Sequence, residues 1–174
     1  MNGDRSFFYT SRQCNYFIMS VFESICRFLT GKGISYRTVH HEPTTTSEES
    51  AKARGEDVKI GGKAIVLKVD TDFKLFVLSA ALKINSKRIK EYFNAKSIRF
   101  ASTEELSTLT GLVPGSVPPF GKPLLDFDLY VDGSIARNEK IAFNAGSLTD
   151  SIIMSAQDYR SVHGGEEFDF SQDS

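Results

Sequence analysis

Lys63 is the first residue whose surroundings point to chemistry, because it follows two glycines at the start of the apolar run "KAIVLKV". A lysine at the mouth of a strand can direct its ammonium group into a cleft, and Gly61 and Gly62 let another group approach the backbone closely. A lysine in this position is more often simply solvated. Lys63 is therefore a candidate for holding a substrate, with a solvated surface residue as the alternative.

The stretch "GLVPGSVPPFGKP", residues 111–123, has glycine or proline at seven of its thirteen positions. Glycine lets backbone N–H groups face a ligand closely, and proline keeps a loop from relaxing, so the donors are presented at low entropic cost. Preorganised N–H donors stabilise developing oxyanions and phosphates. A tight structural connection would have the same composition. The local pattern leaves a binding loop and a connector evenly balanced.

The turn "NAGS", residues 144–147, is a third candidate because it follows the apolar run "KIAF". A small, polar turn that contains glycine often lines a site at the end of a strand. It is as often only a turn, so the pattern leaves both readings open.

Positive charge is concentrated between residues 83 and 99, where six basic residues accompany one acid, Glu91. Lys83, Lys87 and Lys90 recur at helical spacing and would form one ridge on a helix. A positive ridge suits phosphate backbones, and such binding weakens as the salt concentration rises. The alternative is an ordinary solvated helix face.

Several enzyme classes are disfavoured by motifs that the sequence lacks. It contains no G-x-S-x-G, no phosphate-binding G-x-x-x-x-G-K-[ST] and no H-E-x-x-H. His40 and His41 are adjacent, so on an extended strand they face opposite sides and are poor joint ligands for one metal ion. We therefore expect no metal site and no cofactor. Cys26 lies on the apolar side of a predicted helix, which favours a core thiol over a nucleophile.

The size and composition of the chain fit one globular domain with tails. It has 174 residues and a formal net charge of −1, with 40% hydrophobic and 25% charged residues. No apolar run reaches membrane-spanning length, so we expect no membrane partner. The two cysteines form neither a metal-binding spacing nor a disulfide framework, which favours a reduced, cytoplasmic setting. Residues 1–15 are expected to be a disordered extension, with an organelle transit peptide as the alternative.

Hydrophobic periodicity and capping signals predict a mixture of helices and strands. Thr46 and Glu49 have the spacing of a capping box, and Ser102 with its glutamate three residues later repeats it. The irregular order of elements predicts an α+β fold with a largely antiparallel or mixed sheet. Helices are predicted over 16–30, 44–55, 85–94, 102–111 and 155–162, and strands over 34–40, 63–70, 73–80, 97–102, 124–132, 140–146 and 151–155.

Taken together, these features resemble the YbaK/ProX family, the editing domains associated with prolyl-tRNA synthetase. The resemblance lies in the lysine of "GGKAIVLKVD", a G-x-x-x-P loop in "STLTGLVPGSVPPFG" and the turn in "KIAFNAGSLTDSIIMS". It places an editing domain at residues 16–163 and implies a single α+β domain around a mixed, barrel-like sheet flanked by helices. The acidic tail, residues 164–174, lies outside it, and we expect this tail to be mobile or loosely docked.

The resemblance also implies roles for the candidate residues. Lys63 would hold the substrate through its terminal phosphate or its aminoacyl group. Gly115 and Pro119 match the ends of G-x-x-x-P, and the amides of this catalytic loop would grip the aminoacyl carbonyl and the attacking water. His41 matches a histidine of the pocket wall. Further substrate contacts are implied for Ser116, Val117, Pro118, Asn144, Gly146 and Ser147.

The implied activity is that of a free-standing, metal-independent aminoacyl-tRNA deacylase, which hydrolyses the ester of a mischarged tRNA. An aminoacyl ester is already activated, so positioning a water and stabilising the oxyanion can suffice. The implied partners are the tRNA acceptor end, contacted by Lys83, Lys87 and Lys90, and an aminoacyl-tRNA synthetase.

The sequence leaves alternatives open for the amino acid that is removed and for the activity itself. Some relatives carry a histidine or an aspartate where this chain has Ser147, so alanine, cysteine, serine and threonine all stay open. The alternative to a deacylase is a non-catalytic module that binds tRNA or docks on a synthetase, because the sequence shows no acid–base pair. A weaker alternative is a hydrolase of small acyl esters that does not use tRNA.

Overall fold

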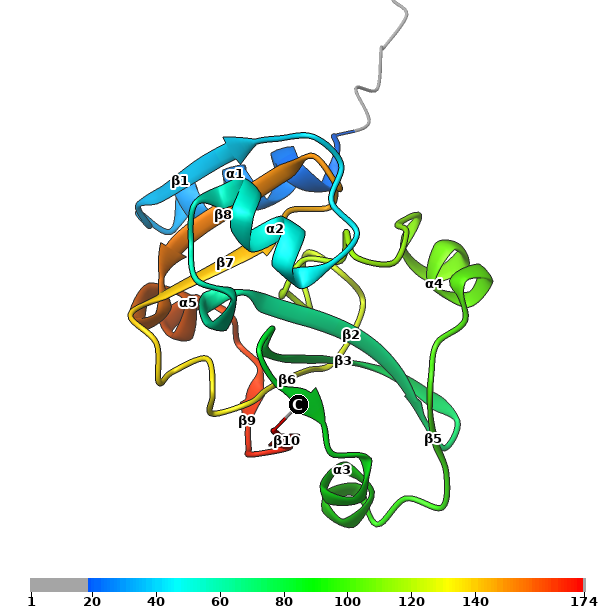
Figure 1. The fold of residues 1–174 in the computed structure, drawn as a ribbon. Helices are drawn as coiled ribbons and strands as arrows, with labels where there is room; N and C mark the ends of the chain where they lie inside the picture. Colours follow the sequence, from blue (N-terminus) through cyan, green and yellow to red (C-terminus); the bar gives the residue numbers. More distant parts are fainter. Residues whose placement is uncertain (1–18, 174) are drawn as a thin grey trace, which may run out of the picture.

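Three β-sheets form the framework of residues 19–173, the part of the chain that the computed structural model describes (Figure 1). The largest sheet has the strand order β5-β2-β3-β6-β9, a second has the order β1-β8-β7, and β10 pairs with β4 in a third. The strands are β1 (Tyr36–His40), β2 (Gly62–Val69), β3 (Asp72–Ser79), β4 (Lys83–Ile84), β5 (Ile98–Phe100), β6 (Leu129–Val131), β7 (Lys140–Asn144), β8 (Asp150–Ser155), β9 (Glu166–Glu167) and β10 (Ser171–Gln172).

The strand directions are mixed, as the sequence predicts for an α+β fold. The predicted hairpin is formed by β2 and β3, and β2 is also antiparallel to β5, whereas β6 runs parallel to β3 and to β9. The expected barrel-like sheet is not supported, because the described strands form three sheets and no closed barrel. One bridge, between Gly61 and Ala142, joins the two larger sheets, and the short β5 leaves part of β2 uncovered.

Five α-helices and a short 3-10 helix pack around the sheets in the described part of the chain. Both predicted capping boxes are present, with Thr46 and Ser102 as the N-caps. Figure 1 shows α1 behind the sheet β1-β8-β7 and α2 in front of it. None of the described helices is long and apolar enough to cross a membrane. The helices are α1 (Val21–Gly31), α2 (Ser47–Arg54), η1 (Val58–Ile60), α3 (Ser86–Phe93), α4 (Thr103–Thr110) and α5 (Ala156–Val162).

Several predicted elements are shorter in the structure than expected, and two of them differ most. The predicted strand over 124–132 is reduced to Leu129–Val131, because the preceding residues turn back on themselves and Gly121 O accepts from the N–H groups of Leu124 and Leu125. The predicted helix over 16–30 begins at Val21 in the described residues, after a Ser20 cap. Residues 1–18, which include the predicted extension 1–15, lie outside the described part.

Residues 75–78 of the hairpin strand β3 are buried on both faces, which explains why this part of the strand is entirely apolar. Leu75 and Val77 point into a core that also contains Ile25 and Leu29 of α1. The side chains between them, such as Phe76, point the other way, into a second core beneath α3. Because successive side chains on a strand alternate in direction, one strand contributes to both cores.

The C-terminal tail is packed against the domain, so the expectation of a mobile or loosely docked tail is wrong. Its strand β9 pairs with β6, and β10 pairs with β4. Phe170 is fully buried and lies edge-on to Phe76, with ring centroids 5.3 Å apart. Phe168 stacks on Tyr92 of α3 at 3.8 Å. The acidic composition suggested solvation, but these two aromatic side chains anchor the segment.

A buried carboxylate fixes the backbone of the tail. Asp132 accepts hydrogen bonds from the N–H groups of Phe170 and Ser171 at 2.7 and 2.8 Å, and from the Ser171 hydroxyl at 2.9 Å. Burial acts to raise the pKa of Asp132, yet these bonds and those from Ser134 outweigh it and leave the pKa below its usual value. The carboxylate therefore stays ionised and holds the tail down at neutral pH.

We expect the substitution Phe170→Ala to lower the free energy of unfolding by about 3–5 kcal/mol, because it empties a fully buried aromatic site. Urea unfolding followed by circular dichroism measures this change. Phe168→Ala is the matched control: its side chain is only partly buried, so a smaller loss is expected. A loss below about 1 kcal/mol for Phe170→Ala would show that the tail does not contribute to the core.

Candidate active site

A cavity of about 320 Å³ opens between α2, β2, the region around α4 and the loop that follows α4. This volume falls in the range of about 300–1,000 Å³ that is typical of small-molecule pockets. One wall is the edge of β2 that β5 leaves free, because β5 pairs only with Leu67–Val69. The lining residues come from segments 44–54, 61–66, 100–106 and 114–117, with Ala80 and Asn144.

Lys63 lies on this wall and is half-buried. Its Nζ donates to the carbonyl oxygen of Leu82 at 2.6 Å. Burial lowers the pKa of the Lys63 ammonium, Glu48 acts to raise it, and Lys83 acts to lower it. Lys63 forms no ion pair with a described carboxylate. A partly desolvated cation without a paired acid favours the binding of an anionic or carbonyl group.

The two glycines before Lys63 allow close packing within the protein as well. A Cβ on Gly62 would come within 2.6 Å of the Ile141 side chain, and one on Gly61 would come within 2.8 Å of Ala80. The absence of side chains therefore lets the start of β2 lie against β7. Both glycines also line the cavity, next to Lys63.

The loop with the sequence "GSVPP", residues 115–119, is fixed at both ends. At its start, Asn144 Nδ2 donates to the carbonyl oxygen of Gly115 at 2.9 Å. At its end, the buried hydroxyl of Tyr159 donates to the carbonyl oxygen of Pro119 at 2.7 Å. Gly115 has φ +87°, which a residue with a side chain rarely adopts. The loop is thus preorganised by partners on β7 and α5.

Two backbone donors of this loop are free. Gly115 and Val117 line the cavity, and their N–H groups have no hydrogen-bond partner among residues 19–173. The N–H of Ser116, which lies between them in sequence, donates to Val113 O at 3.1 Å. Pro118 and Pro119 have no N–H, and these two residues and Ser116 do not line the cavity. The free donors suit a carbonyl oxygen that becomes an oxyanion.

The turn of residues 144–147 supports the loop, and only its first residue lines the cavity. Asn144 lines the cavity, and the N–H of Gly146 donates to Ser116 O at 2.9 Å. Gly146 has φ +80°, and a Cβ there would lie 2.6 Å from Val21. Ser147 faces the turn itself, where its hydroxyl donates to Asp150 Oδ2 at 2.8 Å.

His41 is not among the residues that line the cavity. Its Nε2 lies 2.7 Å from the hydroxyl oxygen of the buried Ser151, and its Nδ1 lies 2.8 Å from Glu42 O. The structure therefore connects His41 to the site through Ser151. No group of three or more histidine, cysteine, aspartate or glutamate side chains suited to a metal ion occurs in the described residues.

Arg54 is a residue of the site that sequence reasoning missed. It is the last residue of α2, 8% exposed, and it lines the cavity. Burial lowers its pKa to about 10, so it stays charged at neutral pH. A basic residue in the last turn of a helix is common at solvated surfaces, because it complements the helix dipole. Only the tertiary structure shows that this guanidinium points inward.

The electrostatic character of the lining is clear from its composition. It contains two cations, Lys63 and Arg54, and no carboxylate. Hydroxyl side chains from the segment 44–50 supply further polar groups. Phe100 is 59% exposed and forms an apolar part of the rim. This lining can hold a group with negative or developing negative charge, and it provides no carboxylate to act as a base.

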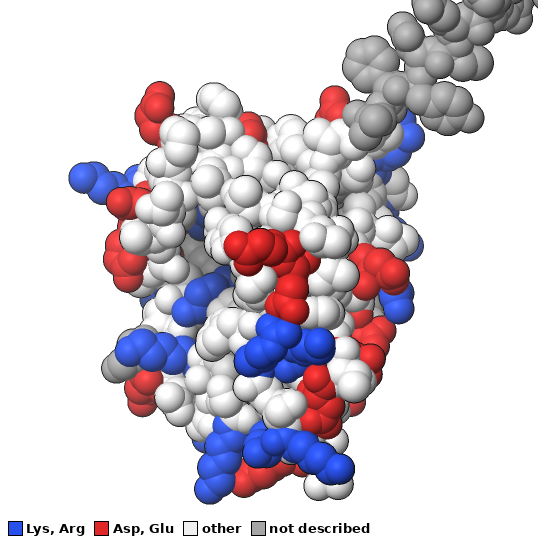
Figure 2. Space-filling view, turned by 90° about the vertical axis from the view of Figure 1, so that its right-hand side faces the viewer, with Lys and Arg blue, Asp and Glu red and all other residues white. Residues whose placement is uncertain are grey.

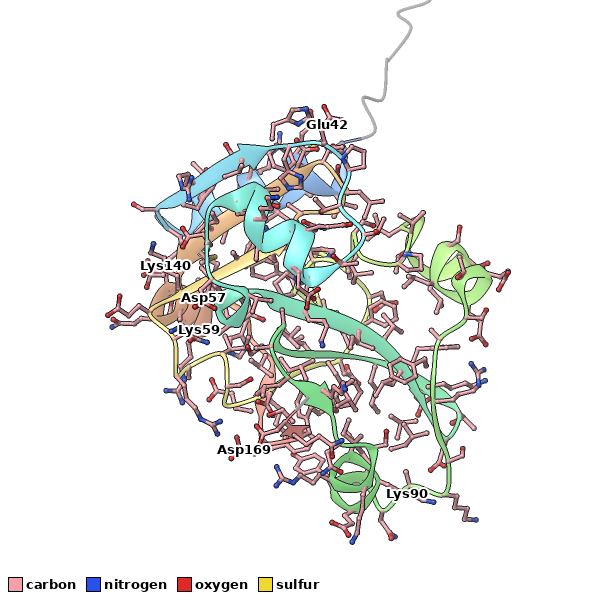
Figure 3. The ribbon with its side chains drawn as sticks, in the orientation of Figure 1. Glu42, Asp57, Lys59, Lys90, Lys140 and Asp169 are labelled. Atoms are coloured by element: carbon pink, nitrogen blue, oxygen red, sulfur yellow. The ribbon has the colours of Figure 1, made fainter. Side chains whose placement is uncertain are left out.

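The predicted ridge of Lys83, Lys87 and Lys90 is exposed but does not line the cavity. The prediction of one helix face is wrong, because Lys83 lies on β4 and only Lys87 and Lys90 lie on α3. Figure 3 places Lys90 on α3, at the opposite end of the molecule from Glu42, which follows β1. In Figure 2, basic side chains gather at the lower end of the molecule, the level of α3 in Figure 1. A ligand in the cavity reaches Lys90 only if it extends well beyond the cavity, whereas Lys83 lies near enough to Lys63 to lower the pKa of that ammonium.

Comparison with known proteins identifies relatives that match most of the chain. The 30% identical Multifunctional Ser/Thr-tRNA deacylase ProXp-y of Escherichia coli (strain K12) aligns over 154 residues, 85% of this chain and 91% of that protein. The proline–tRNA ligase of Shouchella clausii (strain KSM-K16) is 32% identical over 131 residues, 70% of this chain but 23% of the ligase.

Solved structures share the fold at lower sequence identity. A candidate trans-editing enzyme for prolyl-tRNA synthetase has a TM-score of 0.76 and 20% identity, covering 89% of this chain and 99% of that one. The hypothetical protein APE2540 has a TM-score of 0.77 and 22% identity, covering 86% and 100%. The sequence model of the aminoacyl-tRNA editing domain matches residues 41–162. The chain therefore belongs to the aminoacyl-tRNA editing domain family.

Proposed function

We propose that this protein hydrolyses the ester bond between a wrongly attached amino acid and its tRNA. The observation that carries the proposal is the meeting of Lys63 and the free N–H groups of Gly115 and Val117 in one cavity. These groups suit an ester whose carbonyl oxygen becomes negative during the reaction. Membership of the editing-domain family and the similarity to ProXp-y support the same reaction.

In the proposed mechanism, the protein positions the ester and stabilises charge. Lys63 binds the terminal phosphate or the aminoacyl group, and the free N–H groups of the 115–119 loop donate to the carbonyl oxygen. A water attacks the carbonyl carbon, the bond to the ribose oxygen breaks, and that oxygen takes up the proton that the water releases. The adjacent ribose hydroxyl can relay this proton, so the site needs no carboxylate base. An aminoacyl ester is activated enough for positioning and oxyanion stabilisation to suffice.

We propose serine and threonine as the amino acids that are removed. The lining hydroxyls of the segment 44–50 offer hydrogen-bond partners to a hydroxylated side chain. A site that hydrogen-bonds a substrate hydroxyl rejects analogues that lack it far more strongly than an apolar pocket rejects a missing methylene. The name of the relative ProXp-y, a Ser/Thr-tRNA deacylase, supports this choice.

The tRNA itself is proposed to extend from the cavity toward α3. The exposed ring of Phe100 at the rim can stack on a terminal base, because such stacking tolerates any base. The ridge of Lys83, Lys87 and Lys90 would then contact phosphates of the acceptor stem. Such a protein would act in the cytoplasm with the translation machinery. Association with a synthetase is supported by the similar segment in proline–tRNA ligases.

Replacing Lys63 by alanine is expected to lower kcat/KM for Ser-tRNA or Thr-tRNA deacylation by about 100-fold or more, because the cation that holds the substrate is removed. Release of radiolabelled amino acid from mischarged tRNA measures the rate. Lys140→Ala is the control, since Lys140 pairs with Glu56 outside the cavity (Figure 3). Full activity of Lys63→Ala would disprove the mechanism. Salt-sensitive tRNA binding by wild type without turnover of any charged tRNA would instead indicate a binding module.

Replacing Gly115 by valine is expected to lower kcat about 100-fold while the melting temperature falls by only a few degrees. A β-branched residue is strained at φ +87°, so the loop shifts and its N–H groups lose their alignment. Gly111→Val is a matched control, because Gly111 has φ +70° and open space around it but does not line the cavity. If both variants lost activity in proportion to stability, the loop would have only a structural role.

The double substitution Lys87→Glu/Lys90→Glu is expected to raise KM for mischarged tRNA without changing kcat, because these residues lie outside the cavity. The slope of log KM against log salt concentration should fall by about one for each phosphate that the ridge no longer neutralises. Lys59→Glu, an exposed charge reversal on η1, is the control (Figure 3). An unchanged KM and salt dependence would remove the ridge from the tRNA-binding surface.

A further inference from the structure

We propose that Arg54 is a positioning residue that acts through Asn144 to aim the free N–H groups of the 115–119 loop at the substrate. The inference rests on the proposed deacylase function and assigns a role to a buried cation at the same site. The role is one of orientation: Arg54 sets the direction of a side-chain amide, and that amide sets the direction of a peptide group.

A continuous series of hydrogen bonds connects Arg54 to the loop. Arg54 Nη2 donates to Asn144 Oδ1 at 2.7 Å, and Asn144 Nδ2 donates to Gly115 O at 2.9 Å. The Gly115 carbonyl belongs to the peptide plane that precedes Ser116. Holding that plane limits how the flanking N–H groups of Gly115 and Val117 can turn. The series crosses three segments that are distant in sequence: α2, β7 and the loop.

The orientation of the Asn144 amide follows from its surroundings. Its Oδ1 accepts from Arg54 Nη2 and from the hydroxyl of Ser151, the latter at 3.1 Å. A guanidinium has donors but no acceptor, so a flipped amide would place its own NH2 group against N–H donors. Arg54 therefore keeps Nδ2, the donor end of the amide, turned toward Gly115 O.

Arg54 itself is held in place by neutral groups. Its Nε donates to the Ser151 hydroxyl oxygen at 2.9 Å, and its Nη1 lies 3.4 Å from Ala142 O. No described carboxylate forms an ion pair with it. The planar guanidinium reaches Ser151 and Asn144 at the same time, which a lysine ammonium at the end of a flexible chain does not reproduce.

Stability alone gives no reason for a charge at this position. Burying a cation without an acidic partner is unfavourable, and an apolar side chain of similar volume is often as stable in such a place. If Arg54 were methionine, Asn144 Oδ1 would still accept from Ser151, so this oxygen would keep a hydrogen-bond partner. Arg54→Met should therefore fold, and its defect should lie in the geometry of the loop.

The decisive experiment is a double-mutant cycle that joins Arg54 and Asn144. We expect Arg54→Met to lower kcat for Ser-tRNA or Thr-tRNA about 10- to 100-fold, with KM changed less than about threefold, because misplaced donors weaken transition-state binding. Asn144→Ala should have a similar effect. If Arg54 acts through Asn144, the double variant should match Asn144→Ala alone.

Other outcomes would overturn the proposal. Multiplicative losses in the double variant would show that Arg54 acts independently of Asn144. Near-complete recovery by Arg54→Lys would show that the charge alone matters, and a raised KM at constant kcat would make Arg54 a direct substrate contact. Arg37→Met is the matched control, because Arg37 is an exposed arginine that pairs with Glu56 outside the cavity.

A spectroscopic measurement tests the proposal without relying on turnover. In ¹H–¹⁵N spectra, Arg54→Met should shift the backbone amide signals of Gly115, Ser116 and Val117 and the side-chain amide signal of Asn144, while Arg37→Met should leave them in place. Unshifted loop signals would overturn the positioning role even in an active enzyme. If wild type hydrolysed no charged tRNA but the loop signals shifted, the proposed function would fail and the positioning contact would stand.

Discussion

The partly uncovered edge of β2 is the constraint on which the site depends. β3 pairs with all eight residues of β2, whereas β5 pairs only with the last three. Just beyond β5, the N–H of Ala101 donates to Val66 O. Because alternate residues of a strand direct their backbone groups to the same side, Ala64 presents its own N–H and C=O to the uncovered edge. The cavity occupies the space beside this edge, and α2 and the 115–119 loop form its other walls. A longer β5 would fill the site with a strand.

Local signals in the sequence predicted the local structure, because capping and turn chemistry act within a few residues. Thr46 and Ser102 cap their helices as their spacing indicates, and the hairpin follows from two β-rich runs around a polar turn. Pairing between distant strands has no such local signal. The tail shows this limit: its charges suggest solvation, but the burial of Phe170 depends on Phe76 and on Asp132, which are far away in sequence.

The residues of the site that belong to sequence motifs were predictable. Those that reach the site only through tertiary contacts were not. Lys63, Gly115 and Asn144 stand in recognisable motifs, and the structure brings all three to one cavity. Arg54 stands at the end of a helix whose sequence is typical of a solvated surface. Its burial arises because α2 lies against the sheet that contains β7 and β8, an arrangement that no pattern within α2 reveals. Its role therefore needs the structure.

Under the proposed function, the polar groups of the site favour ester hydrolysis without a carboxylate base. Lys63 and Arg54 are bound to neutral oxygens, so their positive charges are not cancelled by paired acids. The free N–H groups of the loop add dipoles, and hydrogen bonds from Asn144 and Tyr159 hold the loop in advance. In a partly desolvated cavity, fixed charges and dipoles act strongly on a developing oxyanion, since little reorganisation is needed when the charge appears. In the proposed reaction, negative charge that develops in the cavity interacts favourably with the unpaired Lys63 cation, so a charge that is unfavourable to bury also stabilises the transition state.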